Sequence, residues 1–329
     1  MLEERKNQIN QTPIVRLEKI CKKYEDHTLF LKKNESSTFA VKGVDLEIRP
    51  NETVAVVGES GCGKSTVAKL ILGLIEPTDG KILYDGIEKS QLQKDEQRKL
   101  VQDIQMVFQD PYGAFNPKMK IKKIIAEPLS VNRRYSSSEI DRICQNIIEH
   151  VGLKREDLNK YPDEFSGGQR QRIAIARAIV GTPRLIICDE PVSALDLLVQ
   201  AQILNLLKDI QEENKIAYLF ISHDLAVVRH VSDYVVVMYL GKIVEKGSKN
   251  QIFDNPKHPY TRLLLNSSVS VHKKMQDVEM CNDIDESNKE NKCCPFYNRC
   301  PLAKDKCREK EPGLKEYESG HEVACFLLN

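Results

Sequence analysis

The stretch Gly58–Thr66 constrains the fold of this chain more than any other, because it reads G-E-S-G-C-G-K-S-T and matches the pattern G-x-x-x-x-G-K-[ST] in full. A short apolar run, Thr53 to Val57, precedes the loop, and the run Val67 to Leu72 follows it. Strand, glycine loop and helix in this order form a turn whose backbone N–H groups surround phosphate oxygens at a helix N-terminus. The sequence therefore predicts an α/β fold with a phosphate-binding turn.

The polar residues of this loop have distinct expected roles. Lys64 is expected to reach the outer phosphates of a nucleotide, and the hydroxyl of Ser65 is placed to bind magnesium. Cys62 occupies a free position of the motif, and we expect no chemistry from it. The predicted nucleotide-binding residues of the loop are Gly58, Ser60, Gly61, Gly63, Lys64, Ser65 and Thr66.

A second apolar run, Leu185 to Cys188, ends in the acidic pair Asp189 and Glu190. The run is short for a helix and is typical of a buried parallel strand. At the end of this strand Asp189 would hold magnesium, directly or through water, and Glu190 would orient and deprotonate the water that attacks the γ-phosphate. An acidic pair at a strand end is often only a solvated turn, but the upstream glycine loop favours the catalytic interpretation.

A third motif, Phe165-Ser166-Gly167-Gly168-Gln169, lies between the other two. Its hydroxyl and its free N–H groups come directly before the helical run Arg170 to Val180, which predicts a second anion site at a helix N-terminus. One nucleotide has no need of both anion sites on one chain. The predicted binding residues here are Ser166, Gly167, Gly168 and Gln169.

The order of motifs along the chain resembles that of ABC transporter nucleotide-binding subunits. After the glycine loop come F-Q-D-P with Gln109, F-S-G-G-Q-R-Q-R, I-I-C-D-E-P, S-A-L-D ending at Asp196, and I-S-H-D with His223. The run N-P-K-H-P-Y-T at Asn255–Thr261 and the cysteine-bearing tail are similar to the ATP-binding subunits of bacterial oligopeptide/dipeptide importers. The resemblance covers the chain from about Ile14 onward. It implies an ATP hydrolase with a P-loop NTPase (RecA-like) domain, an inserted helical subdomain and Asp196 in the nucleotide site.

The resemblance also assigns roles that the residues alone do not reveal. Gln109 would touch magnesium and the attacking water and would report occupancy to a membrane partner. His223 would contact the γ-phosphate and hold the geometry of the water. Tyr24 is the expected aromatic that stacks on adenine, while Phe30 and Phe39 remain alternatives for this role.

Partners follow from the same resemblance. Two cassettes would dock head to tail, so that the Ser-Gly-Gly-Gln motif of one covers the ATP held on the glycine loop of the other. The second cassette is expected to be a paralogue, and the pair would serve two membrane permease subunits and, indirectly, an external substrate-binding protein. The expected function is ATP hydrolysis that drives the import of oligopeptides or dipeptides at the cytoplasmic face of the membrane.

Two other functions remain as alternatives. An ATPase for a nickel or metal-chelate importer shares the motif set and the His-Pro-Tyr segment. A soluble ABC ATPase of translation or DNA repair is less favoured, because the interval from Lys64 to Ser166 has no sustained heptads for a coiled-coil insertion.

Composition agrees with a peripheral cytosolic ATPase. The 329 residues carry a net charge of +1, and their Lys and Arg residues form no stripe that would suggest nucleic acid. The first 13 residues lack the apolar core of a signal peptide. No apolar run approaches the roughly 18 residues that a membrane helix needs. We therefore expect membrane attachment through partners.

The pattern of polar and apolar stretches predicts four regions. They are a polar extension at 1–13, an ABC ATPase domain at 14–265 with a helical subdomain at about 106–180, a polar linker at 266–292, and a cysteine-rich tail at 293–329.

Four cysteines of the tail, Cys294, Cys300, Cys307 and Cys325, have the spacing C-x5-C-x6-C-x17-C. A cytosolic chain of this size gives no reason for a disulfide scaffold, so metal binding is the first hypothesis. The spacing lacks the C-x2-C turns common in zinc sites, and four thiolates suffice for an iron–sulfur cluster. Some members of the resembled family carry a four-iron four-sulfur cluster on such a tail. Zinc and free thiols stay open, as does the choice between Cys293 and Cys294.

Overall fold

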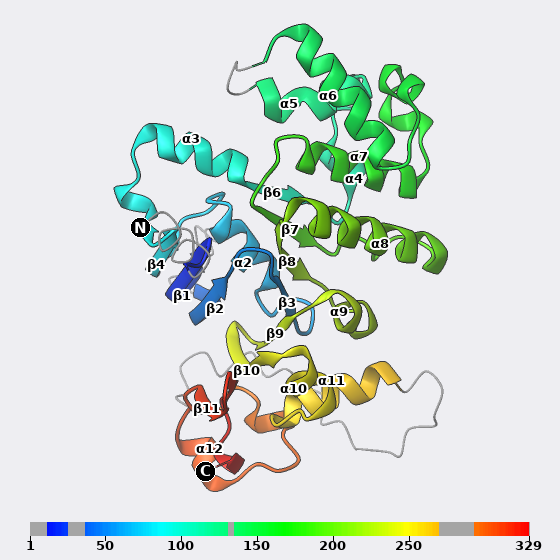
Figure 1. Ribbon diagram of the computed structural model, residues 1–329. Helices are drawn as coiled ribbons and strands as arrows, with labels where there is room; N and C mark the ends of the chain where they lie inside the picture. Colours follow the sequence, from blue (N-terminus) through cyan, green and yellow to red (C-terminus); the bar gives the residue numbers. More distant parts are fainter. Residues whose placement is uncertain (1–11, 26–36, 131–134, 270–292, 329) are drawn as a thin grey trace, which may run out of the picture. The chain divides into compact units, whose positions relative to one another are not determined.

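The computed structural model describes residues 12–25, 37–130, 135–269 and 293–328, and the chain divides into two compact units (Figure 1). Phe30, most of the predicted N-terminal extension and residues 270–292 of the predicted linker lie outside the described residues. Among the described residues, unit 1 consists of those within 12–15, 47–53 and 83–221, and unit 2 of those within 16–46, 54–82 and 222–328.

Three parallel strands form the sheet of unit 1. The middle strand, β7 (Leu185–Asp189), pairs with β6 (Ile104–Val107) on one side and with β8 (Ala217–Ile221) on the other. β8 is buried along its whole length, and β7 is buried up to its last residue. Continuous apolar strands of this kind belong to parallel sheets that are covered on both faces. The strand predicted for β7 is confirmed.

Helices account for most of the rest of unit 1. Within the stretch from 106 to 180, α5 (Ile121–Ser130) packs against both α6 (Ser137–His150) and α7 (Gly167–Ile179), and α7 also packs on β6 (Figure 1). The helices are α3 (Lys94–Asp103), α4 (Pro111–Ala114), α5 (Ile121–Ser130), α6 (Ser137–His150), α7 (Gly167–Ile179) and α8 (Leu197–Asn214).

The glycine loop belongs to unit 2, whose main sheet begins with β3 (Thr53–Val57), the strand predicted ahead of the loop. β3 runs parallel to β9 (Tyr234–Tyr239), which pairs antiparallel with β10 (Lys242–Ser248). The edge of β10 carries β12 (His321–Val323), and β12 pairs with β11 (Lys315–Glu318). The cysteine-bearing tail is thus joined to the cassette by strand pairing.

A second sheet places β1 (Val15–Glu25) between β2 (Ser37–Ile48) and β4 (Asp79–Tyr84), and the last two residues of β4 pair with β5 (Ile87–Glu88). The helices of unit 2 are α2 (Lys64–Ile71), α9 (Leu225–Val231), α10 (Lys249–Asp254), α11 (Pro259–Val269) and α12 (Asp305–Glu309). None of the helices in the described residues combines the length and the hydrophobicity needed to cross a lipid bilayer.

Candidate nucleotide-binding site

The glycine loop turns from β3 into α2 in a conformation that only glycine accepts at two positions. Gly58 has φ 149° and Gly63 has φ 105°, both in the region that L side chains rarely adopt. A Cβ atom on Gly58 would lie 2.2 Å from the carbonyl oxygen of Met238, and one on Gly63 would lie 2.2 Å from that of Ala40. Gly63 is also the N-cap of α2 and offers its first turn no side-chain acceptor. The first turn of α2 therefore has no side-chain cap at its N-terminus, the end of a helix that favours an anion.

Lys64 places a positive charge inside the loop. Its side chain is 6% exposed, and its Nζ donates hydrogen bonds to the carbonyl oxygens of Gly58 at 2.9 Å and Glu59 at 2.8 Å. Burial raises the pKa of the neighbouring Cys62 thiol, which keeps the sulfur neutral. Ser60, Gly61 and Ser65 are exposed at the same turn, while Thr66 is half-buried.

Glu59, for which no role was predicted, is contacted by two distant residues. Arg299 donates from Nη1 and Nη2 to the two carboxylate oxygens at 2.8 and 2.9 Å, and these bonds raise the pKa of Arg299. The hydroxyl of Tyr260 accepts the backbone N–H of Glu59 at 3.0 Å. Because these partners lie 201 and 240 positions away in the sequence, no local pattern could have revealed them.

In unit 1, the carboxyl ends of β6 and β7 bring Gln109 and Glu190 together. Asp189 ends β7, and the next residue, Glu190, has φ 48° and donates its N–H to the carbonyl oxygen of Ile221 at 2.9 Å. The Nε2 of Gln109 donates to Oε2 of Glu190 at 2.9 Å. A positive φ at a non-glycine residue costs about 1–3 kcal/mol and is concentrated at functional sites. The predicted base is therefore held in a strained, oriented position.

His223 lies in unit 2, two positions after the last residue of β8, and it is exposed. The turn around it is fixed by hydrogen bonds on both sides. The hydroxyl of Ser222 accepts the N–H of Asp224 at 3.0 Å, and the carboxylate of Asp224 caps α9 by accepting the N–H of Ala226 at 2.9 Å. The predicted γ-phosphate contact therefore sits on a well-defined strand-to-helix turn.

The motif with Ser166 begins α7 and is exposed. Ser166 donates its N–H to Oε1 of Gln169 at 3.0 Å and accepts the N–H of Gln169 at 3.4 Å, which makes a capping box. A Cβ atom on Gly168 would lie 2.5 Å from Cγ1 of Val199 in α8, so this glycine permits close helix packing. Ser166, Gly167 and Gln169 face solvent at the positive end of the helix.

Asp196 acts as the N-cap of α8, where its carboxylate accepts the N–H of Val199 at 3.0 Å. The next two residues, Leu197 and Leu198, are 83% and 70% exposed. Two large apolar side chains side by side in solvent are typical of an interaction surface.

Both described candidates for adenine stacking are exposed. Tyr24 on β1 is 43% exposed, with Nζ of Lys22 at 5.5 Å from its ring centroid. Phe39 on β2 is 42% exposed, with Nζ of Lys23 at 5.8 Å. The assignment of Tyr24 therefore stays a prediction.

The four tail cysteines lie close enough together for their thiol groups to interact electrostatically. Burial raises the pKa of Cys294 to about 11, and the thiols of Cys307, Cys325 and Cys300 act in the same direction. Even so, no group of three or more His, Cys, Asp or Glu side chains that could hold a metal ion occurs among the described residues. The expectations of an iron–sulfur cluster and of zinc thus receive no support from this arrangement.

Comparison with known proteins agrees with the motifs. A family model described as ABC transporter matches residues 41–193, and one described as oligopeptide/dipeptide transporter, C-terminal region, matches residues 244–307. The chain is 44% identical to the oligopeptide transport ATP-binding protein AppF of Bacillus subtilis, over 97% of this chain and 99% of that protein. It is 46% identical to the oligopeptide transport ATP-binding protein OppF of Escherichia coli, over 88% of each.

A solved structure gives the same result for the fold. The ATP-binding cassette MJ0796, in a dimeric post-hydrolysis state bound to ADP and Pi, superposes with a TM-score of 0.62 at 31% identity, over 71% of this chain and 98% of that one. The fold and the motifs therefore define the class as an ABC-type ATPase. Within this class, the chain belongs to the family of oligopeptide/dipeptide transport ATP-binding proteins.

Proposed function

We propose that this chain hydrolyses ATP to drive the import of oligopeptides or dipeptides through a membrane ABC transporter, at whose cytoplasmic face it is peripheral. The names of the relatives and the match of residues 244–307 to the C-terminal region of oligopeptide/dipeptide transporters support this substrate class. They favour it over nickel import and over a role in translation or DNA repair.

The glycine loop is the proposed site for the phosphates of ATP. Lys64 supplies the buried charge, and the uncapped first turn of α2 supplies N–H donors. Ser65 and Asp189, with Gln109, offer the oxygen ligands that magnesium prefers. A bound magnesium ion would neutralise charge on the phosphates. Stacking of Tyr24 on adenine remains part of the proposal.

The contact between Gln109 and Glu190 carries the proposal of hydrolysis. The donated Nε2–H, at 2.9 Å, fixes one carboxylate oxygen of Glu190, and the positive φ of this residue sets the direction of its side chain. Glu190 would accept a proton from the attacking water, and His223 would hold the water in line. Positioning of this kind is most of what phosphoryl transfer requires from a protein.

A second cassette, two permease subunits and an external binding protein are the proposed partners. The exposed start of α7 at Ser166 to Gln169 suits a phosphate brought by another chain, and the exposed Leu197 and Leu198 suit the same docking. We expect the second cassette to be a paralogue. Co-purification from native membranes in mild detergent, followed by mass spectrometry, tests all of these proposed partners. Recovery with ribosomes or with DNA-repair proteins would contradict it.

Replacement of the base is the direct test of hydrolysis. Glu190→Gln should leave ATP binding intact and lower turnover by about 10²–10⁴, which is the usual contribution of a positioned base. Glu212→Gln changes an exposed acid in α8 and should leave turnover unchanged. Near-normal hydrolysis by Glu190→Gln in the assembled complex would remove Glu190 from this role. Uptake of labelled dipeptides and oligopeptides, compared with uptake of nickel, tests the substrate class.

For the tail, the finer proposal is a four-iron four-sulfur cluster on Cys294, Cys300, Cys307 and Cys325, with zinc as the alternative. Backbone N–H groups of Phe296, Leu302 and Leu327 contact the sulfur atoms of Cys294, Cys300 and Cys325, which opposes the larger effect of burial on the pKa of these thiols. Iron, sulfide and zinc analysis of the chain purified without oxygen is the test. Metal contents well below one per chain would reject both.

A further inference from the structure

Glu59, the second residue of the glycine loop, is connected to two segments from the far end of the chain. Arg299 binds its carboxylate with two hydrogen bonds of 2.8 and 2.9 Å, and the Tyr260 hydroxyl accepts its backbone N–H at 3.0 Å. Arg299 ends the 3-10 turn Tyr297–Arg299 in the cysteine-bearing tail. A bidentate arginine–carboxylate pair has a fixed geometry as well as strength, so it restricts where Glu59 can lie.

Both partners of Glu59 belong to or contact one aromatic cluster: Tyr260 is a member of it, and Arg299 packs against it. The ring centroids of Tyr239 and Tyr260 are 4.6 Å apart, and Phe296 lies 5.3 and 5.5 Å from these two rings. Tyr260 and Phe296 are fully buried. The guanidinium carbon of Arg299 lies 5.7 Å from the Tyr239 ring centroid. Packed aromatic rings leave little freedom for the polar groups at their edges, so Glu59 is held by a rigid support.

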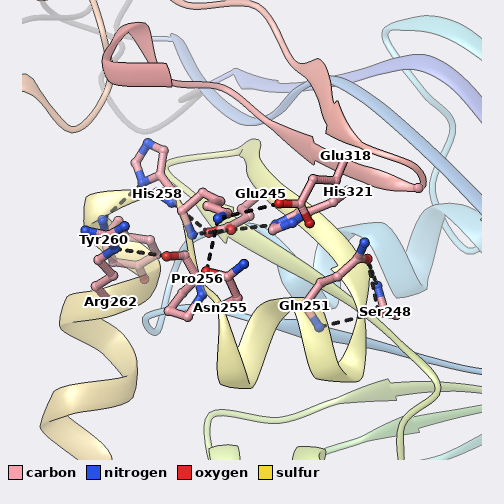
Figure 2. A network of polar contacts seen from close by, with 12 residues as sticks. Glu245, Ser248, Gln251, Asn255, Pro256, His258, Tyr260, Arg262, Glu318 and His321 are labelled. Carbon is pink, nitrogen blue, oxygen red and sulfur yellow. Dashed lines mark hydrogen bonds and ion pairs between the residues drawn. The ribbon is translucent and has the colours of Figure 1, made fainter. Parts of the chain in front are cut away.

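A buried polar network fixes the start of α11, which carries Tyr260 (Figure 2). The carboxylate of Glu245 in β10 accepts the N–H groups of Lys257 at 2.7 Å and His258 at 3.0 Å, and it lies 2.8 Å from Nε2 of His321 in β12. Nδ1 of His258 then accepts the N–H of Tyr260 at 3.0 Å. Hydrogen bonds therefore connect β12 of the tail, β10 and the segment His258–Tyr260 into one network around Tyr260.

We propose that Arg299 and Tyr260 are positioning residues for nucleotide binding, which hold Glu59 and thereby keep the glycine loop in its phosphate-binding geometry. Nucleotide on the loop and order in the cysteine-bearing tail then favour each other, because such coupling is reciprocal. This inference rests on the proposed binding of ATP at the loop.

The first test measures MgADP binding by the full-length chain with calorimetry. Arg299→Gln should raise the Kd about 5- to 10-fold and Tyr260→Phe about 2- to 5-fold, as expected for the loss of a partly exposed charged pair and of one neutral hydrogen bond. Arg299→Lys should recover part of the loss. Arg308→Gln removes an exposed arginine of the same tail and should leave the Kd unchanged. Kd values within twofold of the parent for both Arg299→Gln and Tyr260→Phe would overturn the inference.

The second test uses a readout that a merely structural role would not move. Hydrogen exchange of the tail peptide 294–307, followed by mass spectrometry, should slow when MgADP binds the parent chain, and Arg299→Gln should abolish this dependence. Equal exchange with and without saturating MgADP in the parent chain would overturn the coupling. A parent chain that binds no MgADP at all would instead refute the proposed function, so the two failures are distinguishable.

Discussion

Two helix N-termini that the sequence assigned to phosphate, those of α2 and α7, are built in different ways. α2 begins at Gly63, which has φ 105° and gives the first turn no side-chain acceptor. α7 begins at Ser166, which forms a capping box with Gln169. Neither first turn contains an acidic residue. The N-cap residue of α2 provides no side-chain hydrogen bond, whereas Ser166 and Gln169 cap the start of α7.

A third helix in the same chain shows what an ordinary N-terminus looks like. α6 also begins with a serine box, but Ser136 is paired with Glu139, an acid in the first turn. Acids at this position are common because they complement the helix dipole. Neutral Gln169 at the start of α7 forms the same kind of box without adding negative charge. The two helices predicted to bind phosphate thus differ in capping and share the absence of an acidic residue in the first turn.

Among the changes at these helix N-termini, the largest expected effect concerns α2 and its buried Lys64. Lys64→Ala should weaken ATP binding about 10²-fold, because hydrogen bonds from a charged donor contribute about 1.5–3 kcal/mol. Lys69→Ala, an exposed lysine of the same helix, is the matched control and should bind normally. Calorimetric titration with MgADP measures both variants. An affinity loss below about threefold for Lys64→Ala would mean that α2 binds phosphate through its amides alone.

A smaller effect is expected from placing an acid at the start of α7. Gln169→Glu should preserve the capping box and the stability of the fold, yet lower ATP turnover of the assembled complex about 10- to 100-fold through repulsion of the phosphates. Nucleotide affinity of the isolated chain should not change, since the proposed site for its own nucleotide is at α2. Turnover equal to that of the parent protein would show that no phosphate approaches α7.

The sequence alone was sufficient for the parts of the site that depend on local geometry. The glycine loop, β7 with its acidic end and the serine at the start of α7 were predicted correctly as local structures, because each is specified by about ten neighbouring residues. The roles of Gln109, His223 and Tyr24 came only from family resemblance, and their action on a nucleotide remains a prediction.

Contacts between distant segments could not be predicted. The pairing of Arg299 with Glu59 spans 240 positions, and arginine and glutamate are both common on protein surfaces, so neither residue alone indicates the contact. Strand β12 is three residues long and includes a histidine and a glutamate, so its pattern did not indicate a strand. Both features depend on the packing of the tail, which a single sequence does not reveal.

A comparison of the two N-cap serines, Ser136 of α6 and Ser166 of α7, distinguishes helix capping from phosphate binding. Ser136→Ala and Ser166→Ala should each lower the free energy of unfolding by about 1 kcal/mol, the usual cost of losing an N-cap. Only Ser166→Ala should also lower turnover of the assembled complex, by about tenfold, since one hydrogen bond to phosphate is lost. Thermal unfolding and ATPase assays on both variants provide the comparison. Equal turnover in the two would leave Ser166 as a cap and nothing more.

The smallest expected effect is a pH dependence that α6 has and α7 lacks. Hydrogen bonds from the N–H and hydroxyl of Ser136 lower the pKa of Glu139 below its ordinary value of 4.5. The folded state therefore favours the ionised carboxylate, so this stabilisation is present above pH 4.5 and is lost as the pH falls through the lowered pKa. Gln169 does not titrate, so the stabilisation by the capping box of α7 does not depend on pH in this range. Urea unfolding from pH 7 to pH 3 should show the stability gap between the parent and Glu139→Gln closing at the acid end. A gap that stays constant would mean that Glu139 acts through geometry alone, and the contrast between a charged box on α6 and a neutral one on α7 would lose its electrostatic basis.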